Sequence, residues 1–363
     1  MIFLLLAILY LVVLATFVVG LRRGLDRSRG VHENVEKPLV TVLVCARNEE
    51  QNIDRCIASL EQLHYPAERL QILVVDDHST DATARHLSEW CRRLPHLQVL
   101  SLTSPHEGGK VNALTVGMDA AIGEFVCITD ADCQVPPSWI EEYLKWYDAA
   151  TGLVSSVTIT NSSHPTAVCQ SIEMMQLLGM SMAGINMGVA VSIIGNNLSI
   201  RRAAYEDIGG YRAIPFSVTE DVALFQAMWQ SRWDVRFKAS DRLLVTTNPP
   251  GSLSAWWRQK QRWVIGAKSL GFIGWFILIL GYVGMIAAFG ALWTQTLPMI
   301  VAVIGIKIIG DLMIIGPMAM SLKRIRLILY VPIYQFYLLF FLVCVPLQYA
   351  QRTVVWKDRD YHT

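Results

Sequence analysis

The stretch FVCITDAD, residues 125–132, decides the fold of this chain. An apolar run that suits a buried strand ends in two carboxylates, Asp130 and Asp132, with one residue between them. Ligands of open α/β sheets bind at the carboxyl ends of the strands. Two carboxylates at such an edge suit a divalent cation, which in turn binds a diphosphate. A strand followed by an acidic turn is the alternative, and the rest of the chain decides between the two.

Strand-like runs alternate with polar helical stretches on both sides of this motif. The predicted strands cover residues 39–46, 70–75, 97–102 and 124–129, and the predicted helices cover residues 50–63, 82–94 and 110–122. Alternation of this kind favours right-handed parallel crossovers. We therefore expect an α/β fold with a doubly wound, mostly parallel sheet.

Polar residues gather where the predicted strands end. The sequence RNEE follows the first strand at residues 47–50, and DDHSTD follows the second at residues 76–81. Ser79 and Thr80 also suit capping of the next helix. GGK at residues 108–110 opens the third helix, where glycine allows close backbone approach and the helix N-terminus favours anions. Neither a P-loop nor a dinucleotide fingerprint is present, because the Walker spacing and GxGxxG are missing.

Two later stretches contain polar residues that could serve a function, but helix structure alone can also explain each of them. TED at residues 219–221 suits a helix N-cap with two acids in the first turn. QKQRW at residues 259–263 lies directly before an apolar segment, where aromatic and basic side chains commonly anchor a helix at the membrane interface.

Four apolar stretches flank the predicted domain, at residues 1–20, 269–293, 298–320 and 327–347. Each is long enough to cross a bilayer. The arginines between residues 22 and 29 follow the first stretch, so the positive-inside rule places the next domain in the cytoplasm, and this order of charges differs from that of a signal peptide. Counting the membrane crossings places the tail outside the cell, whereas the basic residues of the tail favour the cytoplasmic side. The side of the membrane on which the tail lies therefore stays open. Lys307 and Asp311 share a helix face and could pair there, either as a functional intramembrane site or as a structural pair.

Composition narrows the class of protein. The 363 residues are 53% hydrophobic with a net charge of +1, so a nucleic-acid partner has no electrostatic support. The seven cysteines form no CxxC pair and no zinc-ligand spacing, which favours a reducing compartment. The predicted order is a transmembrane anchor at 1–21, a basic cytoplasmic linker at 22–38, a cytoplasmic domain at 39–268, about three transmembrane helices at 269–349 and a tail at 350–363.

The motifs RNEE, DDxSTD, GGK, DAD, TED and QxxRW occur in one chain in this order. The set resembles the membrane-bound family 2 glycosyltransferases of the GT-A fold, which include ceramide glucosyltransferase and the cellulose, chitin and hyaluronan synthases. The resemblance covers about residues 39–263. It implies an inverting, metal-dependent transfer of sugar from a nucleotide-sugar donor, with UDP as the expected nucleotide, and Mn²⁺ or Mg²⁺ as the cofactor.

The resemblance also implies a role for each motif residue. The nucleotide site would be lined by Ala46, Asn48, Glu49, Asp76 and Asp77. Lys110 would lie beside the diphosphate, Asp130 and Asp132 would hold the metal with Asp132 as the direct ligand, and Asp221 would be the general base. The leaving diphosphate would be held, and the acceptor site closed, by Gln259, Arg262 and Trp263.

The acceptor is less constrained than the donor. About four membrane segments are few for a polymer channel, which favours a lipid or lipid-linked acceptor at a bacterial inner membrane. A processive polysaccharide synthase, with a partner subunit, is the alternative, and a non-catalytic membrane scaffold is a remote one. The Met-rich residues 166–188 are expected to form either a core helix or an interfacial helix that lines an apolar acceptor site.

Overall fold

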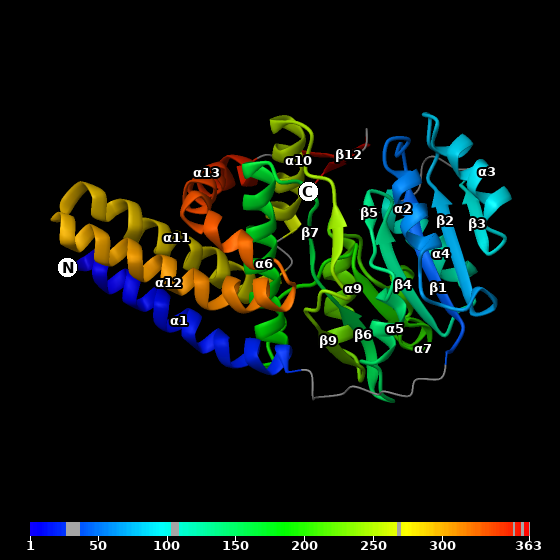
Figure 1. The fold of residues 1–363 in the computed structure, drawn as a ribbon, viewed down its shortest axis with the longest axis horizontal. Helices are drawn as coiled ribbons and strands as arrows, with labels where there is room; N and C mark the ends of the chain where they lie inside the picture. The colour runs from blue at the N-terminus through cyan, green and yellow to red at the C-terminus, as the bar shows by residue number, and fades with distance from the viewer. Residues whose placement is uncertain (27–36, 103–108, 267–269, 351–352, 357–358, 363) are drawn as a thin grey trace. The chain divides into compact units, whose positions relative to one another are not determined.

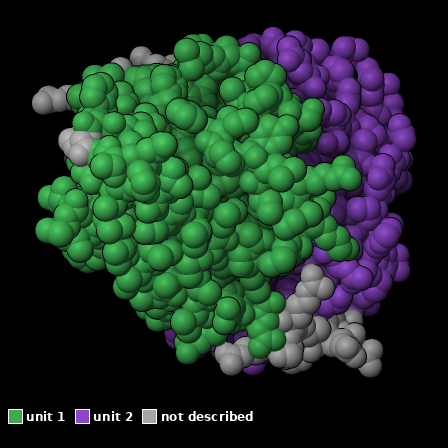
Figure 2. Space-filling model, turned by 60° about the vertical axis from the view of Figure 1, so that its left-hand side comes forward, with its two compact units in different colours: residues 1–26, 159–192, 249–363 green, residues 27–158, 193–248 purple. Residues whose placement is uncertain are grey.

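The computed structural model describes residues 1–26, 37–102, 109–266, 270–350, 353–356 and 359–362, the last two ranges by backbone alone (Figure 1). Most of the predicted linker, Gly108, residues 267–269, and Arg352 and Lys357 of the tail lie outside the described residues. The chain forms two compact units (Figure 2). Unit 1 comprises residues 1–26, 159–192 and 249–363, and unit 2 comprises residues 27–158 and 193–248.

Unit 2 is built on a seven-stranded sheet in the order β3-β2-β1-β4-β8-β6-β9 (Figure 1). Its strands are β1 (Val40–Ala46), β2 (Leu70–Asp76), β3 (Leu97–Ser101), β4 (Phe125–Asp130), β6 (Thr151–Ser155), β8 (Leu198–Arg201) and β9 (Asp234–Phe237). The first four run parallel, and β8 is antiparallel to both of its neighbours. The predicted doubly wound, mostly parallel sheet is therefore confirmed.

The register of the central strands places the motif residues at one edge of the sheet. Ala46 pairs with Asp76 across β1 and β2, and Cys45 pairs with Asp130 across β1 and β4. These strands are buried on both faces, which explains their continuous runs of valine, isoleucine and leucine. Three parallel strands therefore end side by side, where the polar sequence begins.

Helices cover both faces of this sheet. They are α2 (Ile53–Glu61), α3 (Thr83–Arg93), α4 (Gly109–Ala120), α5 (Trp139–Leu144), α7 (Arg202–Asp207), α8 (Gly210–Ala213) and α9 (Glu220–Trp229), with the 3₁₀ helix η1 (Ala67–Arg69) before β2. Helix α2 buries Ile53, Cys56, Ile57 and Leu60, the spacing of one helical face. A second, small sheet pairs β5 (Cys133–Gln134) with β10 (Val245–Thr247), and β7 (Thr158–Thr160) lies at the boundary between the units.

The described residues of unit 1 contain four helices that are long and apolar enough to cross a membrane, as predicted. They are α1 (Ile2–Leu25), α11 (Gly271–Thr294), α12 (Leu297–Ser321) and α13 (Val331–Ala350), the last preceded by the 3₁₀ helix η3 (Ile325–Tyr330). Unit 1 also contains α6 (Pro165–Ile185), α10 (Leu253–Gly266) and the hairpin β11 (Thr353–Trp356) and β12 (Arg359–His362).

A buried polar network joins the helices of unit 1. Lys307 Nζ lies 2.6 Å from Asp311 Oδ2, which confirms the predicted pair. Asp311 also accepts hydrogen bonds from Tyr10 of α1, Gln176 of α6 and Gln335 of α13. Because every member of this network is buried, the network holds the helix bundle together and offers no surface to a ligand.

The Met-rich helix α6 is a core helix of unit 1. Met175, Met180 and Met182 are buried, as is most of the helix. A Cβ at Gly20 of α1 would lie 2.1 Å from the carbonyl oxygen of Ala183, so α1 approaches α6 at backbone distance. Packing of this kind agrees with the core-helix interpretation of residues 166–188.

Candidate active site

The loops that follow β1 and β2 are hydrogen-bonded to each other. Asn48 N donates to Ser79 Oγ at 3.0 Å, and Thr80 N donates to Asn48 Oδ1 at 2.8 Å. Asn48 and His78 have left-handed φ angles of 53° and 58°, a conformation that non-glycine residues adopt most readily when they are Asn, Asp or His. Strained backbone of this kind clusters at ligand sites. The predicted nucleotide-binding loops are therefore one preformed structure.

The predicted capping role of Ser79 and Thr80 is wrong. Helix α3 starts at Thr83, and Asp81 Oδ1 accepts the hydrogen bond from Thr83 N at 3.0 Å. The Ser79 hydroxyl instead accepts from Asn48 N, and the Thr80 hydroxyl donates to Asn48 Oδ1 at 3.3 Å, both in the neighbouring loop. Hydroxyl and carboxylate side chains compete for the same role at a helix start, and here a partner distant in sequence holds both hydroxyls.

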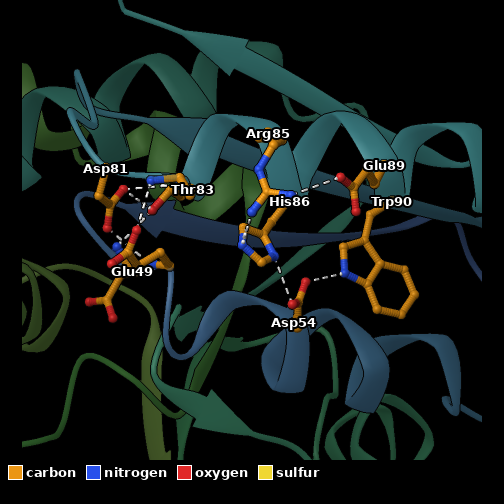
Figure 3. Close-up of polar contacts among 10 residues, drawn as sticks. Glu49, Asp54, Asp81, Thr83, Arg85, His86, Glu89 and Trp90 are labelled. Carbon is orange, nitrogen blue, oxygen red and sulfur yellow. Dashed lines mark hydrogen bonds and ion pairs between the residues drawn. The ribbon is translucent and has the colours of Figure 1, made fainter.

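Contacts between α2 and α3 support these loops (Figure 3). Glu49 N donates to Thr83 Oγ1 at 2.8 Å, and Asp54 lies between His86 and Trp90. Asp54 Oδ1 accepts from Trp90 Nε1 at 2.8 Å. The two helices are thus tied together directly behind the loops that they follow.

Asp76 and Asp77 lie at the end of β2 and are only 5% and 4% exposed. Asp76 Oδ1 accepts a hydrogen bond from Ser79 N at 3.1 Å, and Asp77 Oδ1 lies 3.0 Å from His78 Nδ1. The main-chain oxygen of Asp77 accepts from Arg47 Nη1 at 2.8 Å. Both carboxylates are therefore held in place at the strand-end edge, beside Ala46.

Lys110 joins two of the predicted motifs. Its Nζ lies 2.7 Å from Asp130 Oδ1 and 2.9 Å from Glu220 Oε1, so the start of α4 meets the end of β4 and the start of α9. Gly109, directly before it, has a φ of 54°, which explains the glycine at that position. Burial favours the neutral amine, but the two carboxylates outweigh burial and raise the pKa of Lys110 well above its usual value.

Asp132 is half-buried in the turn between β4 and β5. Burial, with the nearby carboxylates of Asp130 and Glu49, raises its pKa to about 6. The described residues contain no group of three or more His, Cys, Asp or Glu side chains arranged to hold a metal ion. Two carboxylates nevertheless fit a hard cation whose other ligands are waters and phosphate oxygens, as is usual for Mg²⁺. The concentration of negative charge around Asp132 thus suits a divalent cation.

Asp221 is fixed in the first turn of α9 by two backbone amides. Its Oδ2 accepts from Gly195 N at 2.8 Å and its Oδ1 from Val222 N at 2.9 Å. Burial and the adjacent Glu220 raise the pKa of Asp221 to about 6, although Lys110 and the two amides oppose this shift. Thr219 occupies the N-cap position of α9, and Glu220 and Asp221 lie in its first turn, as the structural alternative predicted, but the Thr219 side chain makes no capping bond.

Gly195 is a site residue that the sequence analysis missed. A Cβ at this position would lie 2.9 Å from the Asp221 Cβ, closer than real Cβ atoms approach a neighbour. Only glycine therefore allows the amide to reach the carboxylate. No local pattern signals this contact, because it joins residues that are 26 positions apart.

The predicted motif residues Gln259, Arg262 and Trp263 lie on α10 of unit 1, whereas the motif acids belong to unit 2. Their spacing of three and four residues places them on one face of the helix. All three are half-buried, whereas Trp256, Lys260 and Val264 form a buried face.

Comparisons with known proteins agree with this arrangement. Residues 41–209 match the family described as Glycosyl transferase family 2. A beta-monoglucosyldiacylglycerol synthase from Nostoc is 27% identical over 236 residues, 63% of this chain and 49% of that protein. A poly-beta-1,6-N-acetyl-D-glucosamine synthase from Staphylococcus epidermidis is 25% identical over 244 residues, 66% of this chain and 56% of that protein. The chain thus spans about half the length of these relatives.

A solved structure shares the fold. It is a mannosyltransferase from Pyrobaculum calidifontis in complex with GDP-Man and Mn²⁺, with a TM-score of 0.59 at 20% identity, and the match covers 92% of this chain and 99% of that one. The parallel sheet, the ordered motifs at its edge and the match over residues 41–209 lead to one conclusion. This chain contains a glycosyltransferase family 2 domain, over residues 41–209, and has the GT-A fold.

Proposed function

We propose that this protein is an inverting glycosyltransferase that moves a sugar from a nucleoside-diphosphate sugar, with UDP as the nucleotide, to a lipid or lipid-linked acceptor at a membrane. One observation carries the proposal. Lys110 contacts both Asp130 of the carboxylate pair and Glu220, the neighbour of Asp221, so the charge-binding motif and the candidate base lie in one cluster.

The donor and the cation would share the strand-end edge. In this proposal Ala46, Asn48, Glu49, Asp76 and Asp77 line the nucleotide site, and Lys110 lies beside the diphosphate. Asp132, with Asp130, would hold Mn²⁺ or Mg²⁺, which neutralises charge on the departing diphosphate when bound. The carboxylates that raise the pKa of Asp132 support this assignment, because they repel one another unless a cation lies between them.

Asp221 would act as the general base. An acceptor hydroxyl is a weak nucleophile, so a fixed carboxylate must take its proton as the new bond forms. The amides of Gly195 and Val222 hold the Asp221 carboxylate in one orientation. One base and one in-line displacement invert the anomeric centre, unlike the paired carboxylates of a retaining glycosidase.

The pH dependence of turnover should report this base. The pKa of Asp221 is raised to about 6, so its ionised form is lost as the pH falls through that value. A protonated carboxyl accepts no proton, and kcat should therefore fall about tenfold per pH unit below this point. Without metal, the pKa of Asp132 is also raised to about 6. A bound cation favours ionised Asp132, so with saturating Mn²⁺ the fall in kcat near pH 6 should report Asp221. A kcat that stays constant down to pH 4 would contradict the assignment.

Gln259, Arg262 and Trp263 would hold the leaving diphosphate and close the acceptor site. Arg262→Lys tests this role, since lysine keeps the charge but lacks the planar fork that binds a phosphate in two places. We expect kcat to fall at least about tenfold while the protein still inserts and folds. Arg258→Lys, an exposed change on the same helix, is the matched control and should keep the wild-type kcat. If Arg262→Lys and Arg258→Lys have the same kcat, the motif serves only to anchor the helix at the membrane interface.

A lipid acceptor is favoured by the four apolar helices, which are few for a polymer channel. The Nostoc relative is named for a glycolipid product, whereas the Staphylococcus relative is named for a polymer. A processive synthase with a partner subunit is therefore the second candidate. Membranes incubated with a panel of labelled nucleotide sugars would decide. A single sugar on a chloroform-soluble product supports the proposal, a lengthening water-soluble chain supports the alternative, and no transfer from any donor would refute both.

We also propose the order of segments along the chain: anchor 1–21, linker 22–38, catalytic domain 39–268, membrane helices 269–349 and tail 350–363. The catalytic domain would lie in the cytoplasm of a bacterial cell, where nucleotide sugars are found. Cysteines placed at the exposed Glu89 and Arg232 should then escape an impermeant maleimide until the cells are opened.

The matched control for this topology is Thr296→Cys, between α11 and α12. By helix parity it should react from outside. The reverse pattern of labelling would invert the topology and separate the active site from its cytoplasmic donor.

A further inference from the structure

Lys260 is a buried cation in the middle of the Gln259–Trp263 motif. It is 0% exposed, although it lies between half-buried motif residues on α10. Burial of an ammonium group is costly unless a partner compensates. Burial lowers the pKa of Lys260, and the partner described next opposes that shift.

The partner is Glu173 of α6, which no motif includes. Its Oε2 lies 2.5 Å from Lys260 Nζ and also accepts from Tyr337 Oη of α13 at 2.9 Å. Tyr337 Oη in turn accepts from Trp256 Nε1 of α10 at 2.9 Å. One carboxylate, 2% exposed, thus ties α6, α10 and α13 of unit 1 together.

The same ammonium contacts a motif residue. Lys260 Nζ lies 3.9 Å from the centre of the Trp263 ring, the geometry of a cation–π contact. A chain of direct contacts therefore runs from Glu173 through Lys260 to Trp263. These contacts fix both the rotation of α10 about its axis and the orientation of the indole.

Stability alone does not explain this pair. Glu173 Oε1 is buried and has no hydrogen-bond partner among the described residues. An apolar pair of similar volume is often as stable as a buried ion pair, or more stable. The pair retains a charge under Trp263 that apolar packing would not supply.

We propose that Glu173 is a positioning residue for the Gln259–Trp263 motif, acting through Lys260 to hold the Trp263 ring. The inference rests on the proposed function, since it assigns to Glu173 an effect on the transfer step. Glu173 itself touches neither substrate nor metal in this proposal.

The decisive variant is the double change Glu173→Met with Lys260→Met, which replaces the ion pair by an apolar pair. We expect an unfolding temperature at or above that of the wild type, with a kcat that falls about 10-fold to 10²-fold because the motif is misplaced. The KM for the donor should stay within about twofold, since the nucleotide loops are untouched. A kcat equal to wild type would show that the pair is only structural and would overturn the proposal.

Glu173→Gln gives a second, milder test with a matched control. Asp311→Asn makes the same acid-to-amide change beside another buried lysine of unit 1, and Asp311 bonds to α1, α6, α12 and α13 but not to α10 in the described contacts. We expect Glu173→Gln to speed amide hydrogen exchange over residues 259–263 and to lower kcat, and Asp311→Asn to do neither. Unchanged exchange in Glu173→Gln would contradict the positioning role.

Hydrogen exchange also distinguishes a failure of the proposed transferase function from a failure of the positioning role of Glu173. If the wild-type protein transfers no sugar, the proposed function fails, yet exchange over residues 259–263 still reports whether Glu173 holds α10. If the wild type is active and neither exchange nor kcat responds to Glu173, only the positioning role fails.

Discussion

Replacement of Asp132 by alanine or asparagine should abolish sugar transfer and greatly weaken donor binding in Mn²⁺. Asp132 would be the direct ligand of the cation, and its pKa of about 6 reflects burial and the repulsion from Asp130 and Glu49. Without its carboxylate the cation loses its anchor and the diphosphate loses its counter-charge. Turnover with labelled donor and Mn²⁺ binding by electron paramagnetic resonance would measure the two effects separately.

The unfolding temperature in EDTA distinguishes this result from misfolding. Because a carboxyl whose pKa is raised on folding opposes the folded state once it ionises, Asp132→Asn should be at least as stable as the wild type without metal at neutral pH. Asp119→Asn, an exposed acid that pairs with Arg212, is the control and should keep its activity. Normal transfer by folded Asp132→Asn, or full turnover of the wild type in EDTA, would rule out the metal assignment.

The elements of the parallel sheet were predictable because their signals are local. Residues 125–128 form a short continuous apolar run, which is typical of a strand buried on both faces, and α2 shows the spacing of an amphipathic helix. The order of the strands was not predictable. The position of β8 between β4 and β6, antiparallel to both, depends on pairings between residues far apart in the chain.

In the candidate site, too, residues within recognisable motifs could be predicted from the sequence, whereas residues that act through distant contacts could not. Asp130 and Asp132 were predicted from their position at the end of a buried strand, and Asp221 from the family resemblance; the structure places Asp130 in contact with Lys110. Gly195 and Glu173 gave no such signal, since each acts through a contact with a distant segment. Such contacts are set by how the elements pack, which no window of sequence contains.

Asp221→Asn should separate chemistry from binding. The amide occupies the space of the carboxylate, and its oxygen can still accept from the amide of Gly195 or Val222, but it cannot take a proton from the acceptor. We expect kcat to fall by about 10²-fold or more, the range of general acid–base catalysis, while donor affinity is retained. Thr219→Ala is the matched control in the same turn, because Thr219 makes no side-chain capping bond and its loss should leave kcat and stability nearly unchanged. If Asp221→Asn keeps its rate, the acid only favours the start of α9; if donor affinity collapses instead, Asp221 belongs to the donor site and the base lies elsewhere.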